Sequence, residues 1–196
     1  MAEDNERREY LLYYIDLCES VNLIDEMGEA MMERAKMPIE FSEKERNYFS
    51  ICSKNTVGRL RTSHRHLKSS TEVTADNRIK SDVVSELTEK VVNKIVKACK
   101  LVEDTLENVI YPYSQLAENK IFCHKLIADY QRYRCEVSEP KERQILMESS
   151  KKHYQTAEEM AKDLSPVDLS KLGIALNFSV FCYEIENEHK KAYDMA

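Results

Sequence analysis

The chain contains 196 residues, of which 42% are hydrophobic and 33% are charged. This is enough apolar material for a folded core and too much for a disordered chain. The net charge of −6 disfavours a general nucleic-acid binder, because such proteins need clustered positive charge to release phosphate counterions. With only three glycines and four prolines, the sequence predicts an all-α fold of long helices rather than a β-sandwich or an α/β sheet.

The sequence indicates neither secretion nor membrane insertion. No run of about 18 apolar residues occurs, so a transmembrane helix is not expected. Residues 1–14 are acidic and polar, whereas a signal peptide is first basic and then apolar. We therefore expect a cytoplasmic protein that does not bind a membrane. The cysteines are scattered without a CxxC pair, which predicts buried free thiols rather than a disulfide or zinc framework; they are Cys18, Cys52, Cys99, Cys123, Cys135 and Cys182.

The first third of the chain is predicted to form three helices. Two short helices cover about 5–18 and 22–36. The third begins at a capping box formed by Ser42 and Glu45, in which each residue satisfies a free backbone N–H group of the other. It is expected to end where the polar stretch 69–76 forms a loop.

The middle of the chain is predicted to form three further helices. Apolar residues recur every four positions over about 77–110, which indicates an amphipathic helix; they are Ile79, Val83, Leu87, Val91 and Ile95. Pro112 ends this helix. Helices over about 114–137 and 142–163 follow, and Pro140 separates them.

The next helix has a clear start signal in Ser165 as a cap, Pro166 at the first helical position and Asp168 in the first turn. It should extend to about Asn187, and residues 189–196 are similar to the start of an eighth helix. Two sides of the helix contain apolar residues, which is typical of a central helix or of one that lines a groove. One side contains Ile174, Phe178, Phe181, Cys182 and Ile185, and the other contains Gly173, Leu176, Asn177, Val180 and Glu184.

Two earlier helices carry charged stripes. The segment 51–70 has no acidic residue, and Lys54, Arg61 and Arg65 lie within about 40° of one another on a helix. The opposite side is expected to be buried and contains Phe49, Cys52, Thr56, Leu60 and Leu67. The helix over 114–137 carries a second stripe, bordered by Tyr133, of Lys125, Asp129, Arg132 and Glu136. Taken alone, each stripe is also compatible with an ordinary solvated surface.

Three stretches together resemble the 14-3-3 family: RNYFSICSKNTVGRLRTSHR (46–65), ADYQRYRCEV (128–137) and LGIALNFSVFCYEIEN (172–187). The resemblance implies an antiparallel helical bundle in which about seven or eight of the family's nine helices are present. Residues 1–196 would then form a single 14-3-3-like domain that lacks the usual C-terminal helices.

The resemblance also implies a function and a site. The chain would be an adaptor, and not an enzyme, that binds phosphoserine or phosphothreonine segments of client proteins. The phosphate ligands would be Lys54, Arg61, Arg132 and Tyr133. The peptide groove would contain Lys125, Leu176, Asn177, Val180 and Glu184.

The sequence departs from the family at its usual dimer contacts. Leu23, Leu87 and Lys94 stand where the family has an arginine, a tyrosine and a glutamate. The familiar salt bridge is therefore lost, and we expect any homodimer or heterodimer to depend mainly on apolar contact.

Two rival interpretations remain open at this point. The first is a phosphate-independent helical scaffold or dimerisation partner with an incomplete groove. The second is an enzyme, which is disfavoured because no catalytic or nucleotide-binding motif occurs in a suitable context. No cofactor, metal or nucleic-acid partner is expected. His64 with His66, and Cys123 with His124, are spaced so that their side chains diverge on a helix.

Overall fold

The computed structural model describes residues 2–74 and 76–195, and within these ranges it contains helices and turns but no strand. The predicted all-α fold is confirmed. The α-helices are α1 (Ala2–Ser20), α2 (Ile24–Ala35), α3 (Glu43–Thr74), α4 (Arg78–Thr105), α5 (Ala117–Cys135), α6 (Pro140–Met160), α7 (Leu169–Glu184) and α8 (His189–Met195). A π-helical turn, η1 (Leu106–Ile110), and a 3-10 turn, η2 (Tyr111–Tyr113), follow α4.

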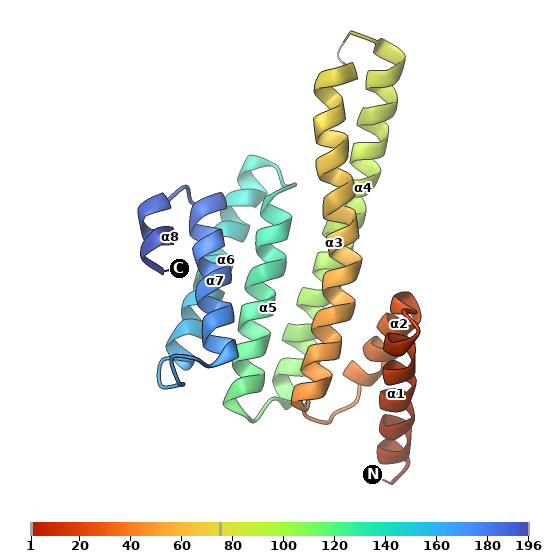
Figure 1. Cartoon of the computed structure of the whole chain (residues 1–196), viewed down its shortest axis with the longest axis vertical. Helices are drawn as coiled ribbons and strands as arrows, with labels where there is room; N and C mark the ends of the chain where they lie inside the picture. Colours follow the sequence, from red (N-terminus) through yellow and green to blue (C-terminus); the bar gives the residue numbers. More distant parts are fainter. Residues whose placement is uncertain (1, 75, 196) are drawn as a thin grey trace. The chain divides into compact units, whose positions relative to one another are not determined.

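The chain divides into two compact units. The first comprises the residues up to Arg34 together with Asn47–Lys100. It contains a long antiparallel pair formed by most of α3 and α4, and the shorter pair α1 and α2 (Figure 1). Its buried side chains come from all four helices and are mostly aliphatic or aromatic; they include Leu11, Ile15, Met27, Met31, Phe49, Val57 and Ile95.

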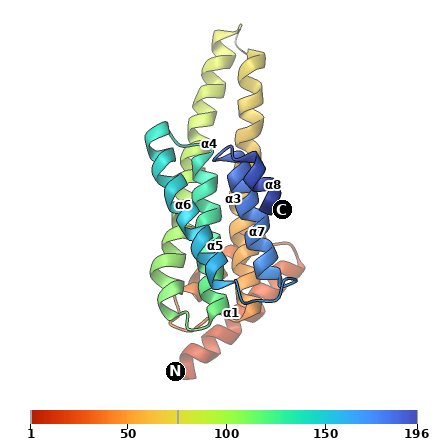
Figure 2. The same ribbon diagram turned by 90° about the vertical axis from the view of Figure 1, so that its left-hand side faces the viewer.

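The second unit comprises Ala35–Arg46 and the residues from Leu101 onward. Its helices α5, α6 and α7 lie side by side, and α8 packs against α7 (Figure 2). The ring of Tyr154 stacks on that of Phe178 with centroids 5.2 Å apart. The predicted apolar side of α7 is buried in full, which confirms it as the packing face; it consists of Ile174, Phe178, Phe181, Cys182 and Ile185.

The two start signals read from the sequence have different outcomes. The capping box is confirmed: the backbone N–H of Ser42 donates to the Glu45 carboxylate at 2.7 Å, and α3 begins at Glu43. The predicted cap Ser165 is wrong, because α7 begins only at Leu169. Asp168 is the N-cap, and its carboxylate accepts hydrogen bonds from the backbone N–H groups of Ser170 and Lys171.

The loop expected at 69–76 is also wrong for most of its length, since α3 continues to Thr74. The hydroxyls of Ser69 and Ser70 donate to the carbonyl of His66, and that of Thr71 donates to the carbonyl of Leu67. Each side chain thereby bonds to the preceding helical turn instead of competing with it. A polar stretch on an exposed helix is therefore compatible with continued helical structure.

All six cysteines are buried, and none is joined to another. Burial raises the pKa of the Cys52 thiol to about 11 and that of Cys135 to about 11, so both remain protonated near neutral pH. Among the helices in the described ranges, none combines the length and the apolar character that crossing a bilayer requires.

An ion-pair network in the second unit has a buried arginine at its centre. Arg134 donates to Glu103 on α4 at 2.9 Å and to Glu142 on α6 at 2.8 Å. Glu103 is almost fully buried. Burial raises its pKa from the ordinary 4.5 to about 7, although the Arg134 guanidinium partly opposes this shift. The folded chain therefore binds more protons at Glu103 than the unfolded chain does between about pH 4.5 and 7.

We predict that the free energy of unfolding falls as the pH rises from 5 to 7, because Glu103 must lose its proton within the folded protein. In urea denaturation experiments across this pH range, the free energy of unfolding should decline less for Glu103→Gln, whose side chain cannot ionise, than for the parent chain. Glu86→Gln, which removes an exposed carboxylate, should retain the decline of the parent chain. Equal slopes for Glu103→Gln and the parent would contradict this assignment.

Candidate functional site

The basic stripe of α3 is in the first unit. Lys54 is exposed and Arg61 is half-buried. Arg59, on another side of the helix, forms a salt bridge with Asp25 of α2. The stripe is therefore distinct from the side of α3 that contacts α2.

The predicted buried side of α3 is only partly correct. Phe49 and Cys52 are buried, but Thr56 is exposed, and Val57, which the sequence analysis missed, is buried instead. The Thr56 hydroxyl donates to the carbonyl of Cys52, one turn earlier. The side of α3 that is buried depends on which helices pack against it. The spacing of residues along α3 does not specify those neighbouring helices.

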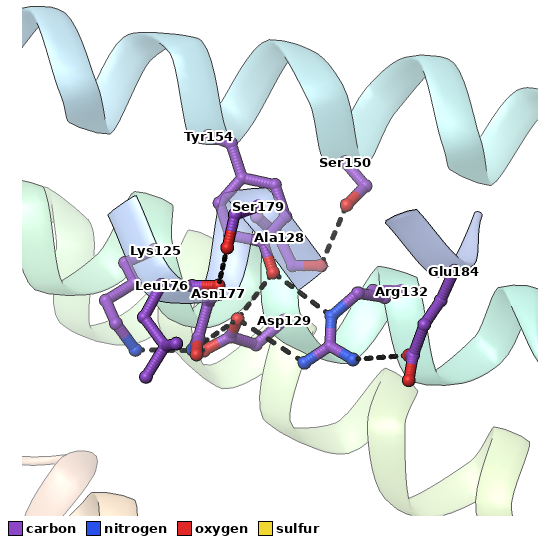
Figure 3. A network of polar contacts seen from close by, with 10 residues as sticks. All are labelled: Lys125, Ala128, Asp129, Arg132, Ser150, Tyr154, Leu176, Asn177, Ser179 and Glu184. Atoms are coloured by element: carbon purple, nitrogen blue, oxygen red, sulfur yellow. Dashed lines mark hydrogen bonds and ion pairs between the residues drawn. The ribbon is translucent and has the colours of Figure 1, made fainter. Parts of the chain in front are cut away.

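The second charged stripe is centred on Asp129 of α5, which is almost fully buried. Its carboxylate accepts hydrogen bonds from three side chains on three helices (Figure 3). Lys125 of α5 donates at 3.0 Å, Tyr154 of α6 at 2.5 Å, and Asn177 of α7 at 2.8 and 2.9 Å. Lys125 and Asp129, two members of the predicted stripe, form an i,i+4 ion pair that lies in a buried polar network rather than on the ordinary solvated surface that the stripe alone allowed.

Arg132 joins the same network and is also buried. Its Nε donates to the Tyr154 hydroxyl at 3.3 Å, and its terminal nitrogens lie 4.0 Å from Asp129 and 3.6 Å from Glu184. The guanidinium carbon lies 4.7 Å from the centre of the Tyr133 ring. These contacts on several sides hold the guanidinium in one orientation.

The Asp129 carboxylate also determines how the Asn177 amide is oriented. Both hydrogen bonds to Asp129 use the Nδ2 group, which is a donor, so the Oδ1 acceptor is directed away from the carboxylate. Among the described residues, none donates to Oδ1. The half-buried Asn177 therefore presents a carbonyl oxygen that is able to accept a backbone N–H from a ligand.

The remaining predicted groove residues border this network on α7. Leu176 is 59% exposed, Val180 is half-buried, and Glu184 is exposed. A Cβ atom at Gly173 would lie 3.3 Å from Cε of Lys125, so the absence of a side chain there makes room for the lysine stem. The structure thus brings Lys125, Arg132, Asn177 and Glu184 together around Asp129 within one unit.

Tyr154, which connects Asp129 to Arg132, is not among the residues predicted from the sequence. Burial, followed by the nearby Asp129 carboxylate, raises the pKa of this phenol well above its usual value, so it remains a hydrogen-bond donor. The sequence offers no signal for this role, because Tyr154 reads as one more core residue of α6. Its contacts depend on how α6 packs against α5.

Two of the predicted phosphate ligands come from the first unit. Lys54 and Arg61 are on α3, whereas Arg132 and Tyr133 are on α5 of the second unit, so their assembly around one phosphate remains a prediction. The predicted dimer residues Leu23, Leu87 and Lys94 are all exposed.

We predict that Asp129→Ala lowers the free energy of unfolding by about 3–5 kcal/mol, because it leaves the buried charges and donors around it without compensation. Urea denaturation followed by circular dichroism measures this change. The matched control is Glu86→Ala, which removes a carboxylate that accepts from Lys90 at the same i,i+4 spacing but on an exposed surface; it should have no measurable effect. Similar losses for both variants would show that Asp129 is not the centre of the network.

Comparison with known proteins agrees with these features. The family described as "14-3-3 protein" matches residues 14–196. The "14-3-3-like protein 2" of Caenorhabditis elegans is 36% identical over 190 residues, which cover 96% of this chain and 77% of that protein. The "14-3-3 protein 9" of Solanum lycopersicum is 35% identical over 199 residues, covering 100% and 76%. The human "14-3-3 protein beta/alpha" is 35% identical over 181 residues, covering 92% and 74%. The chain therefore belongs to the 14-3-3 family.

Proposed function

We propose that this chain is a non-enzymatic adaptor that binds phosphoserine- or phosphothreonine-containing segments of client proteins, as 14-3-3 proteins do. The observation that carries the proposal is the network around Asp129, which buries Arg132 and fixes the orientation of Asn177. A binding site for an extended peptide needs such side chains held in place before the ligand arrives.

The chemistry of the phosphate suits the four proposed ligands. A phosphorylated side chain carries about −1.5 to −2 charges and three strong acceptor oxygens. Arg61 and Arg132 each offer a planar fork of N–H donors, Lys54 adds a point charge, and the Tyr133 hydroxyl adds a further donor. The Nε of Arg132 donates to Tyr154, so the terminal nitrogens, which lie 4.0 Å from Asp129 and 3.6 Å from Glu184, are the groups that would bind a phosphate.

The client backbone would be bound by α7. The Oδ1 atom of Asn177 is oriented to accept a backbone N–H group, and an extended peptide has such groups unpaired. Leu176 and Val180 on the same helix supply apolar contact for client side chains, and Lys125 and Glu184 supply polar contacts beside them. Phosphate recognition and backbone recognition would thus share one supporting carboxylate, Asp129.

The alternative is a helical scaffold that binds partners without regard to phosphorylation. The two functions differ in one measurable quantity, which is the difference in affinity between a phosphorylated peptide and its unphosphorylated form.

We predict that Arg61→Ala and Arg132→Ala each weaken phosphopeptide binding by about ten- to a hundredfold, since charge-assisted hydrogen bonds contribute roughly 1.5–3 kcal/mol each. Calorimetry with a matched pair of phosphorylated and unphosphorylated peptides measures the effect. Arg59→Ala is the control, because Arg59 pairs with Asp25 on another side of α3; its affinity should equal that of the parent chain.

Circular dichroism of Arg132→Ala accompanies the binding measurement, since Arg132 is buried and its removal also affects folding. If Arg61→Ala and a folded Arg132→Ala both retain the full phosphate-dependent difference, the proposed ligands are wrong. A parent chain that binds both peptides equally would support the phosphate-independent scaffold instead.

We also propose that the first unit mediates dimerisation through apolar contact. Exposed apolar side chains on α1, on the α1–α2 turn and on α4 support this; they are Tyr10, Tyr13, Leu17, Val21, Leu23, Ile79, Val83 and Leu87. Contiguous exposed apolar patches on a protein surface commonly mark interaction sites. A homodimer and a heterodimer with a related chain are both compatible with this surface.

We predict a dimer whose dissociation constant changes little between low and high salt, because apolar contact is not screened by ions. Sedimentation velocity at both salt concentrations measures it. Leu87→Glu should favour the monomer, whereas Leu101→Glu, which alters an exposed leucine of α4 in the other unit, should not. Dissociation of the parent dimer by moderate salt would contradict the apolar interface.

A further inference from the structure

Two histidines of the second unit face each other across the α5–α6 pair. The Nδ1 atoms of His124 on α5 and His153 on α6 lie 2.9 Å apart, and the ring centroids are 5.1 Å apart. Both side chains are half-buried. No metal site was expected from the sequence, because the side chains of His124 and its neighbour Cys123 diverge on a helix. The structure instead pairs His124 with a residue 29 positions away on another helix.

We propose that His124 and His153 bind one divalent late transition-metal ion, of the nickel or copper class, through the Nδ1 atoms of both rings. Imidazole nitrogen is a preferred ligand of these ions. Water would complete the coordination, since the two side chains retain access to solvent.

The distance between the nitrogens favours this class of ion. Metal–nitrogen bonds of about 2.0–2.1 Å to two atoms 2.9 Å apart enclose an angle of about 90°. That is the angle between neighbouring ligands in a tetragonal site completed by water, in which Ni2+ is paramagnetic, whereas tetrahedral zinc needs the nitrogens about 3.3 Å apart. The 2.9 Å spacing is that of a hydrogen-bonded pair, so binding requires both rings to turn until their Nδ1 lone pairs face the ion rather than each other.

The surroundings of the pair resemble the outer shell of a metal site. Oε1 of Glu107, in η1, lies 4.0 Å from Nε2 of His153, the nitrogen that would not bind the ion. Metal-binding histidines commonly donate this second N–H group to a carboxylate, which fixes the ring and makes the other nitrogen a better ligand. The ring of Tyr111 packs edge-on against His124 with centroids 5.3 Å apart and covers one side of the pair.

The protonation state of the pair is also compatible with binding. Burial lowers the pKa of both rings, and that of His153 falls to about 4 with contributions from His124 and Lys152. In the metal-free pair one Nδ1–H group donates to the other Nδ1 atom. On binding, that hydrogen moves to Nε2 of the same ring, so both rings are neutral before and after and no net proton is released.

The site is separate from the groove proposed above. His124 is five residues before Asp129, so the two side chains lie about 140° apart around α5. The inference therefore does not depend on the proposed function.

The test is a calorimetric titration of the whole chain with Ni2+, which unlike Cu2+ does not oxidise thiols. We expect one ion per chain, and at least tenfold weaker binding in His124→Gln and in His153→Gln. Glu107→Gln should weaken binding by about tenfold, as is common for a residue that supports a metal ligand.

Two controls address the other metal-binding groups. The double variant His64→Gln and His66→Gln, on α3, and Cys182→Ser, which removes a member of the cluster formed with Glu186 and Glu188, should both bind Ni2+ as the parent does. A second measurement needs no variant: paramagnetic Ni2+ should first broaden the ring signals of His124 and His153 in the NMR spectrum of the parent chain.

The inference fails if Ni2+ first broadens the signals of His64, His66 or His189. It also fails if folded His124→Gln and His153→Gln bind as tightly as the parent chain. Loss of binding in Cys182→Ser alone would assign the ion to the cysteine and glutamate cluster instead.

Discussion

The buried carboxylate of Asp129 is the interaction on which the organisation of the second unit depends. A buried charge is costly unless it is paired and hydrogen-bonded. Asp129 meets this requirement with donors from α5, α6 and α7, namely Lys125, Tyr154 and Asn177 (Figure 3). One carboxylate is therefore hydrogen-bonded to residues of three helices, which fixes their positions along one another. The stacked rings of Tyr154 and Phe178 add apolar packing between α6 and α7.

The same carboxylate connects stability to the proposed function. Arg132 is buried, and its charge is tolerated because Asp129, Glu184 and the Tyr154 hydroxyl surround it. An arginine held in this way has lost its side-chain freedom during folding, so a phosphate that binds to it does not have to restrict it again. Asn177 is oriented by the same acceptor, which leaves its carbonyl oxygen for a ligand.

The α5–α6 pair carries polar features on two of its sides. The side that includes Asp129 faces α7, whereas His124 and His153 contact each other beside Glu107 and Tyr111. Both features join the two helices through side chains that are far apart in the sequence. The metal site that we infer would add a second connection to a pair of helices that the Asp129 network already fixes.

The sequence by itself determined the all-α class, the capping box at Ser42, and the buried side of α7, because helical periodicity and local capping act over a few residues. The tertiary structure alone decided that the Lys125–Asp129 pair is buried rather than solvated. It also decided that Tyr154 bridges Asp129 to Arg132 and that His124 meets His153. These outcomes depend on how helices pack, and the residues brought together by packing are separated by whole helices and leave no common pattern in the sequence.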